Sequence, residues 1–312
     1  MNELVVISGK GGTGKTSLAA AFAVLAEKAV MVDCDVDAAD LHLVLSPSIL
    51  ERHKFSGGSQ ARIKPGHCTA CGKCEELCRF EAVFFDGPGN GRIAKTFRVD
   101  PIACEGCGVC AWFCAENAID FAPAENGQWF VSETRCGPMV HARLNVAAEN
   151  SGKLVTRLRQ AAGQIAQAKG LELVICDGSP GIGCPVIASL TGASLALIVV
   201  EPTMSGMHDF ERIGRLTLRL GVPALVAVNK ADLNPAVADR LEAAAGSLGI
   251  MPVGHIPYDL EVTHAQIAAR SVVETSTGPA AEAITAIWQR VKERLQTCTP
   301  SPCGGQVQIE VK

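Results

Sequence analysis

A glycine-rich segment near the start of the chain reads Gly9-Lys10-Gly11-Gly12-Thr13-Gly14-Lys15-Thr16. It follows the apolar run Leu4–Ser8 and opens a helical pattern over Thr16–Glu27. The segment fits G-x-x-x-x-G-K-S/T, the phosphate-binding loop (P-loop), in the strand–loop–helix context that this motif requires. Backbone N–H groups and the positive end of the helix dipole face phosphate oxygens in such loops. The segment therefore predicts a nucleotide site.

The motif also assigns roles to side chains. Lys15 is expected to reach the β- and γ-phosphates, and Thr16 to bind Mg²⁺. The sequence Asn229-Lys230-Ala231-Asp232 follows a later apolar run and is similar to the base-recognition element of P-loop NTPases. The predicted nucleotide-binding residues are Gly11, Gly12, Thr13, Gly14, Lys15, Thr16, Ser17 and Asn229.

Short apolar runs alternate with helix-length segments in most of the chain. The runs predict strands at Leu4–Ser8, Ala29–Asp33, Leu171–Cys176, Leu195–Val200 and Ala224–Val228. The longer segments predict helices at Thr16–Glu27, Pro185–Thr191, Met207–Leu220, Pro235–Leu248 and Pro279–Leu295. This alternation favours βαβ units, and continuous apolar runs are typical of parallel strands buried on both faces. The predicted fold class is α/β, a doubly wound parallel-sheet P-loop NTPase.

The alternation stops between about Ser46 and Asn150, in a stretch too long for a plain loop. Within it we expect an inserted α+β domain at residues 59–126. The P-loop domain would then be discontinuous, with residues 1–58 and 127–295, and residues 296–312 would form an irregular C-terminal tail.

The expected insertion contains two cysteine motifs of identical spacing. Each position of the first recurs in the second at an offset of 36 residues, as Gly72 does in Gly108. The spacing C-x2-C-x2-C-x3-C is that of bacterial ferredoxins with two [4Fe–4S] clusters, in which the fourth cysteine of each run binds the other cluster. The predicted ligands of one cluster are Cys68, Cys71, Cys74 and Cys114, and those of the other are Cys104, Cys107, Cys110 and Cys78. A pair of structural zinc sites is the alternative, although zinc ribbons use separated C-x2-C pairs.

The whole chain resembles the MinD/ParA superfamily of P-loop ATPases, which includes the nitrogenase iron protein. It is most similar to the ferredoxin-containing branch described as cobyrinic acid a,c-diamide synthase-like. The resemblance rests on the extra lysine of the P-loop, Lys10, on the apolar strand Leu173–Cys176 with Asp177-Gly178, and on Glu201-Pro202-Thr203. It implies ATP rather than GTP as the nucleotide and an ATP-dependent homodimer or a heterodimer with a paralogue. An amidotransferase is not indicated, because no glutamine-hydrolysing nucleophile motif is present.

The resemblance also implies roles for the charged residues. Lys10 would reach the phosphates of the partner subunit, and with Lys15 and Asp35 it forms the expected catalytic set. Asp35 would position the attacking water, and Asp37 is a weaker candidate. Asp33 and Asp177 would join Thr16 around Mg²⁺.

Fourteen cysteines in one chain point to metal binding in a reducing compartment, where disulfides are rare. Beyond the two motifs, Cys184 follows Asp177 at a spacing similar to that of a cluster ligand in the nitrogenase iron protein. The C-terminal pair Cys298 and Cys303 is a further candidate for metal handling. Packing in a tight loop and incidental thiols in a tail are the alternatives.

Composition limits the classes of function. The net charge is −4 without a long Lys/Arg run, so nucleic-acid binding is not expected. The apolar runs are far shorter than the ~20 residues that span a bilayer, so we expect a cytoplasmic protein without stable membrane insertion. The leading hypothesis is an ATPase that couples nucleotide state to electron transfer, or to cluster assembly and delivery, on a redox or metallocluster protein partner. The alternative is a non-redox scaffold or positioning ATPase whose clusters are structural.

Overall fold

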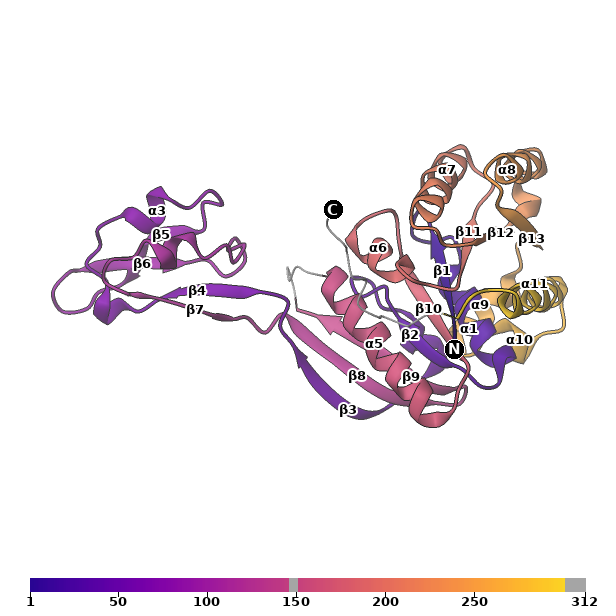
Figure 1. The fold of residues 1–312 in the computed structure, drawn as a ribbon, viewed down its shortest axis with the longest axis horizontal. Helices are drawn as coiled ribbons and strands as arrows, with labels where there is room; N and C mark the ends of the chain where they lie inside the picture. The colour runs from indigo at the N-terminus through magenta and orange to yellow at the C-terminus, as the bar shows by residue number, and fades with distance from the viewer. Residues whose placement is uncertain (146–150, 301–312) are drawn as a thin grey trace. The chain divides into compact units, whose positions relative to one another are not determined.

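The computed structural model describes residues 1–145 and 151–300 (Figure 1). Contacts divide the chain into two compact units. The larger unit contains Met1–His53, Gln128–Arg143 and the chain from Ser151 onward. The smaller unit contains Lys54–Gly127 together with Leu144 and Asn145.

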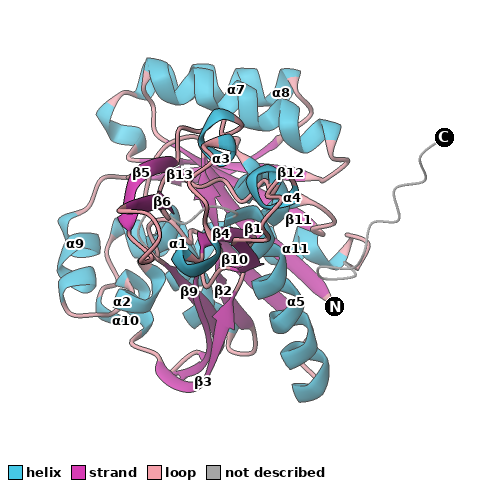
Figure 2. Ribbon diagram, turned by 90° about the vertical axis from the view of Figure 1, so that its left-hand side faces the viewer, coloured by secondary structure: helices cyan, strands magenta, loops and turns pink. Residues whose placement is uncertain are grey.

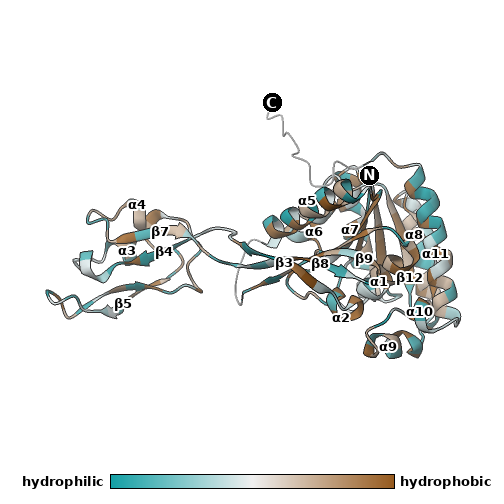
Figure 3. Cartoon of the chain, turned by 90° about the horizontal axis from the view of Figure 1, so that it is seen from below, coloured by the Kyte–Doolittle hydropathy of each residue, from teal (hydrophilic) through white to brown (hydrophobic). Residues whose placement is uncertain are grey.

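A nine-stranded sheet forms the centre of the larger unit, in the order β13-β12-β11-β1-β10-β2-β9-β8-β3. All pairings from β13 to β9 are parallel. The strands are β1 (Asn2–Ser8), β2 (Val30–Asp33), β3 (Ser48–Phe55), β8 (Gly127–Thr134), β9 (Gly137–Leu144), β10 (Leu173–Pro180), β11 (Leu195–Val200), β12 (Ala224–Asn229) and β13 (Met251–Ile256). Strands β1 and β11 are almost wholly buried, as continuous apolar runs between two helical layers should be. The hydropathy colouring shows the same apolar centre (Figure 3).

Helices cover both faces of this sheet (Figure 2). One layer packs around α1 and comprises α1 (Lys15–Ala26), α2 (Leu41–Leu45), α9 (Leu260–Ile267), α10 (Val272–Thr275) and α11 (Pro279–Gln296). The other comprises α5 (Ser151–Lys169), α6 (Cys184–Leu190), α7 (Met204–Arg219) and α8 (Pro235–Ser247). In the first layer, Phe22 and Trp288 join α1 to α11 with ring centroids 4.8 Å apart. The doubly wound fold is therefore the one predicted.

The order in which the chain adds strands to the sheet reverses at β1. The chain passes from β10 on one side of β1 to β11 on the other. Loops that leave the carboxyl ends of strands separate at such a point, and ligands of open α/β sheets bind there. The P-loop, which follows β1, lies at this position.

The smaller unit has two antiparallel strand pairs and two short helices. Strand β4 (Ser59–Ile63) pairs with β7 (Ile119–Pro123), and β5 (Val83–Pro88) pairs with β6 (Lys95–Val99). The helices are α3 (Lys73–Glu76) and α4 (Val109–Trp112), each preceded by a glycine of positive φ, Gly72 at 80° and Gly108 at 76°. The 36-residue sequence repeat is thus also a repeat of local structure.

No helix in the described ranges is long and apolar enough to cross a membrane.

Candidate functional site

A cavity of about 730 Å³ lies against the P-loop of the larger unit. It is lined by Gly11 to Leu18, by Asp35 and Asp40, and by Tyr258, Asp259 and Gln266 among others. Gly12 and Gly14 have φ of 80° and 87°, a region that favours glycine, so the loop can turn its N–H groups toward the cavity. Predicted residues Gly11 to Ser17 and Asn229 all line this space.

Lys15 lies at the centre of an acidic cluster. Its Nζ donates to Oδ1 of Asp177 at 2.8 Å and to Oδ2 of Asp35 at 3.3 Å. Burial opposes the charge on Lys15, but Asp177 and Asp35 outweigh it and raise the pKa of the ammonium. Lys15 therefore stays protonated in the structure and supplies a cation at the base of the cavity.

Asp33 and Asp35 have different surroundings although they are close in sequence. The Oδ1 of Asp33 accepts a bond from the backbone N–H of Asp35, and its Oδ2 accepts one from the N–H of Leu41, so this carboxylate braces the loop after β2. Asp33 is fully buried, and burial together with Asp177 raises its pKa well above the usual range. Asp35 lines the cavity, and burial also raises the pKa of its carboxyl although Lys15 partly offsets this.

Asp177 presents an oxygen without a partner. Its Oδ1 binds Lys15, whereas Oδ2 is buried and accepts no hydrogen bond from the part of the chain that the structure describes. Two carboxylates, those of Asp35 and Asp177, thus pair with one ammonium, and the Asp33 carboxyl lies near them. A divalent cation would correct this excess of negative charge, because oxygen-rich sites are those that Mg²⁺ prefers. The donor set fits magnesium.

Asn229 contacts the P-loop itself. Its Nδ2 donates to the carbonyl of Thr13 at 2.7 Å, and its Oδ1 accepts from the N–H of Lys230. Asp232 accepts a bond from the N–H of Tyr258 at 2.6 Å. The Asn229 and Asp232 side chains of the N-K-x-D sequence are therefore both engaged with neighbouring loops.

Lys10 forms an ion pair that the motif did not predict. Its Nζ lies 3.2 Å from Oε2 of Glu201, while Nζ of Lys230 lies 2.6 Å from Oε1 of the same carboxylate. Glu201 was recognised in the sequence only as part of Glu201-Pro202-Thr203. Glu201 lies directly after β11, the strand beside β1, so the contact follows from the order of the strands in the sheet.

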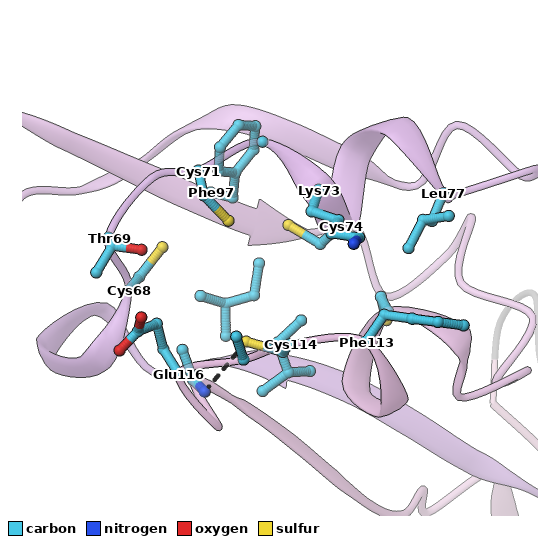
Figure 4. A pocket seen from close by; sticks show the side chains of 16 residues that line it. Cys68, Thr69, Cys71, Lys73, Cys74, Leu77, Phe97, Phe113, Cys114 and Glu116 are labelled. Atoms are coloured by element: carbon cyan, nitrogen blue, oxygen red, sulfur yellow. Dashed lines mark hydrogen bonds between the residues drawn. The ribbon is translucent and has the colours of Figure 1, made fainter.

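The eight motif cysteines line two cavities of the smaller unit. Cys68, Cys71, Cys74 and Cys114 all line one of about 140 Å³, and their sulfur atoms surround its interior (Figure 4). Cys104, Cys107, Cys110 and Cys78 all line another of about 20 Å³. Each cavity is therefore lined by the first three cysteines of one motif and the fourth of the other, and Cys110 lines the first cavity as well as its own.

Backbone amides point at several of these sulfurs. The N–H of Ala70 donates to Sγ of Cys68 at 3.4 Å, and the matching N–H groups of Ala82 and Ala118 donate to Cys78 and Cys114 at 3.4 and 3.3 Å. Burial raises the pKa of the Cys74 thiol to about 11. The thirteen cysteines that the structure describes are free thiols.

Among the described residues, no group of three or more His, Cys, Asp and Glu side chains surrounds the position of a single metal ion. The zinc alternative requires four ligands that converge on one ion. A cubane binds one thiolate at each iron, so its four sulfurs surround a cavity instead. The lining of both cavities fits that arrangement.

The other candidate cysteines that the structure describes, Cys184 and Cys298, line neither of these two cavities. Cys184 is exposed at the first position of α6, Cys298 is partly buried after α11, and Cys303 lies outside the described residues. Cys34 and Cys176 are fully buried in the sheet, next to Asp33 and Asp177 in sequence.

Comparisons with known proteins agree with the fold and the P-loop. A family model described as the CobQ/CobB/MinD/ParA nucleotide binding domain matches residues 4–272. The chain belongs to this family, which confirms the predicted MinD/ParA-type nucleotide-binding class. An uncharacterised protein of Methanocaldococcus jannaschii is 31% identical over 295 residues, which are 93% of this chain and 96% of that protein.

Two solved structures have a similar fold. The cell division ATPase MinD of Pyrococcus furiosus has a TM-score of 0.56 at 16% identity, with 94% of this chain and 98% of that chain covered. The septum site-determining protein MinD of Pyrococcus horikoshii, complexed with Mg-ADP, has a TM-score of 0.55 at 16% identity, with 94% and 96% covered. At these identities the likeness concerns the fold alone.

Proposed function

We propose that the protein is a Mg²⁺-dependent ATPase that holds two [4Fe–4S] clusters in its smaller unit and couples its nucleotide state to iron–sulfur chemistry on a partner protein. The observation that supports it most is the combination of two features in one chain. A P-loop cavity with a buried Lys15–carboxylate cluster occupies one unit, and two cysteine-lined cavities occupy the other.

Adenine is the base that we propose for the nucleotide. In N-K-x-D elements that read guanine, the aspartate has to be available to the base. Here one oxygen of Asp232 is engaged by the N–H of Tyr258, and Nδ2 of Asn229 by the carbonyl of Thr13. Tyr258 and Gln266 line the cavity instead and offer contacts to a base.

Thr16 and Asp177 would hold Mg²⁺. When bound, this ion would neutralise part of the negative charge of the phosphates. The free Oδ2 of Asp177 supports this role. Asp33, whose two oxygens already accept backbone N–H bonds, would act mainly by holding the Asp35 loop in place. When the nucleotide enters, Lys15 would exchange its carboxylate partners for phosphate oxygens.

Hydrolysis would depend on Asp35 and Lys10. Asp35 lines the cavity and would hold the attacking water by accepting one of its protons in a hydrogen bond. Lys10 would stabilise the charge that develops on the phosphates of a partner subunit, as an arginine finger does in GTPases. ATP would thereby promote dimerisation, and hydrolysis would reverse it.

The clusters would supply one-electron chemistry when bound. The chain's own contribution would be the cysteine thiolates and the amide N–H groups that donate to their sulfurs, because such hydrogen bonds tune the potential of a cluster. Two uses are compatible with this arrangement: electron transfer to a redox partner, and assembly or delivery of a cluster on a metallocluster protein. Both require a partner; the scaffold alternative requires clusters that are only structural.

The ATPase part of the proposal is tested by phosphate release from ATP and GTP, with Mg²⁺ and with EDTA. We expect activity with ATP and Mg²⁺ that falls about 10²-fold or more in Lys15→Ala, because the loss of one donor at a developing oxyanion has this effect. Lys28→Ala removes the same charge from an exposed position after α1 and serves as the control. Equal activity of Lys15→Ala and the wild type would refute the assignment of the P-loop.

A further inference from the structure

Three charged side chains meet beside the P-loop, at the ends of three neighbouring strands. Lys10 follows β1, Glu201 follows β11, and Lys230 follows β12. Each oxygen of the Glu201 carboxylate holds one lysine, Oε2 at 3.2 Å from Lys10 and Oε1 at 2.6 Å from Lys230. One carboxylate is therefore shared between the lysine of the P-loop and a second lysine.

Partial burial and ion pairing hold these three side chains in place. The Glu201 side chain is only 15% exposed, and its two lysines are 35% and 30% exposed. Burial opposes the ionisation of Glu201, but the hydrogen bonds from Lys230 and Lys10 outweigh it, so the pKa of this carboxyl lies below its usual value. Glu201 is thus charged at neutral pH and binds both lysines as an anion.

The backbone of Lys230 also has an unusual conformation. Its φ of 55° lies in the left-handed region, which residues with a side chain rarely adopt outside special sites. In this position its Nζ reaches Glu201 and lies 3.4 Å from the carbonyl of Gly12 in the P-loop. Lys230 is therefore anchored to Glu201 independently of Lys10.

This sharing has a consequence for Lys10. A lysine that contacts the phosphates of a partner subunit cannot at the same time contact a carboxylate of its own subunit. When Lys10 leaves, Lys230 remains on Glu201, so the carboxylate is not left without a counter-charge, which would be strongly unfavourable in a largely buried position. The two arrangements of Lys10 can therefore exchange without unfolding the surrounding loops.

We propose that Glu201 is a positioning residue that holds Lys10 within its own subunit until the phosphates of ATP on a second copy of this chain compete for it. Glu201 then sets the protein concentration at which ATP drives dimerisation. This inference rests on the proposed function, in which Lys10 acts across the dimer interface.

The first test needs no nucleotide. The rate at which N-hydroxysuccinimidyl acetate acetylates Lys10 is measured by mass spectrometry in the wild type and in Glu201→Gln. We expect Lys10 to react several-fold faster in the variant, because an amine in an ion pair is less reactive than a free one. Glu211→Gln, which breaks an exposed pair of 3.9 Å with Arg215, is the matched control and should leave Lys10 unchanged. Equal rates in the wild type and Glu201→Gln would overturn the proposal.

The second test is sedimentation with MgATP, in an Asp35→Ala background that prevents hydrolysis. Glu201→Gln should dimerise at a several-fold lower protein concentration, and this gain should vanish when Lys10→Ala is added. A purely structural role of Glu201 would weaken the dimer or leave it unchanged, and either result would overturn the inference. If the wild-type chain formed no dimer with ATP, the proposed trans action of Lys10 would fail. The acetylation rates would still decide whether Glu201 restrains Lys10.

Discussion

At the scale of single residues, the site is organised by charge. Lys15 balances part of an acidic cluster in which Asp33 accepts two backbone N–H bonds, one oxygen of Asp177 has no partner among the described residues, and Asp35 lines the cavity. The sequence placed all these residues at strand ends, and the family resemblance assigned the attacking water to Asp35 and Mg²⁺ to Asp33 and Asp177, but it did not rank Asp33 against Asp177. The ranking depends on which oxygens accept backbone N–H bonds, and such bonds are set by the loop conformation after β2.

Asp35→Asn should hydrolyse ATP about 10²-fold more slowly or worse. A neutral amide accepts a hydrogen bond from the attacking water less strongly than a carboxylate does, and so it positions the water less well. ATP binding should remain within a few-fold, since Lys15 and the P-loop amides are untouched. The measurement is single-turnover hydrolysis together with equilibrium binding of a nucleotide analogue.

Asp37→Asn is the matched control, because Asp37 is exposed two residues away. It should hydrolyse ATP at a rate close to that of the wild type. The assignment of Asp35 would be wrong if Asp37→Asn were the inactive variant and Asp35→Asn the active one.

At the scale of elements, the Arg135–Glu274 pair fixes the β8–β9 turn to α10. Arg135 binds Glu274 through two nitrogens, at 2.8 and 2.6 Å, and also donates to the carbonyl of Val44. The hydrogen bonds from Arg135 lower the pKa of Glu274 to about 2. A pair of this kind joins elements that are far apart in the sequence.

The stability that this pair contributes should depend on pH. Because the folded-state pKa of Glu274 lies below its unfolded value near 4.5, the contribution is complete above that pH and is lost as the pH falls toward about 2. Glu274→Gln should lower the melting temperature at pH 7 by about 1–2 °C, which corresponds to about 1 kcal/mol in a chain of 312 residues.

Melting curves of the wild type and Glu274→Gln between pH 7 and pH 3 are the measurement. The difference between them should be constant down to about pH 5 and then shrink. Glu133→Gln, which breaks an exposed pair with Lys169 at 3.0 Å, should have little effect at any pH. A difference that grew toward acidic pH would contradict the role of Arg135.

The sequence predicted the elements whose patterns are local. Strands β1, β11 and β12 and helices α1, α8 and α11 lie within a few residues of their predicted ranges, because each is a continuous apolar run or begins after a clear glycine or proline signal. Strands β3, β8 and β9 and helix α5 were not predicted individually. Strand β3 is a largely exposed edge strand, and its polar sequence has no core-facing alternation. Its membership in the sheet follows from pairing with distant segments.

The candidate sites, like the helices and strands, were predicted where their signal is local in the sequence. The spacing of the cysteines, an entirely local property, was enough to assign each thiol to one of two groups, and the same groups line the two cavities. The Lys10–Glu201–Lys230 contact could not be predicted in the same way. It depends on the order of β1, β11 and β12 in the sheet, which a single sequence does not specify.

At the scale of the whole molecule, the proposed function needs two chains. Lys10→Ala should keep ATP affinity within a few-fold but should lose ATP-dependent dimerisation and most hydrolysis, because its partner phosphates belong to the other subunit. Sedimentation and phosphate release at several protein concentrations are the measurements. A monomeric chain whose Lys10→Ala variant stays fully active would leave a simple P-loop ATPase.

The proposed coupling of ATP to iron–sulfur chemistry requires that the smaller unit holds clusters. The most direct measurement is the content of iron, acid-labile sulfide and zinc per chain in protein purified without oxygen. We predict about eight irons and eight sulfides, the content of two cubes, and the same values in Cys136→Ser, whose thiol lies in the larger unit. A protein with zinc at full occupancy and without iron would contradict the proposal that this ATPase carries iron–sulfur clusters.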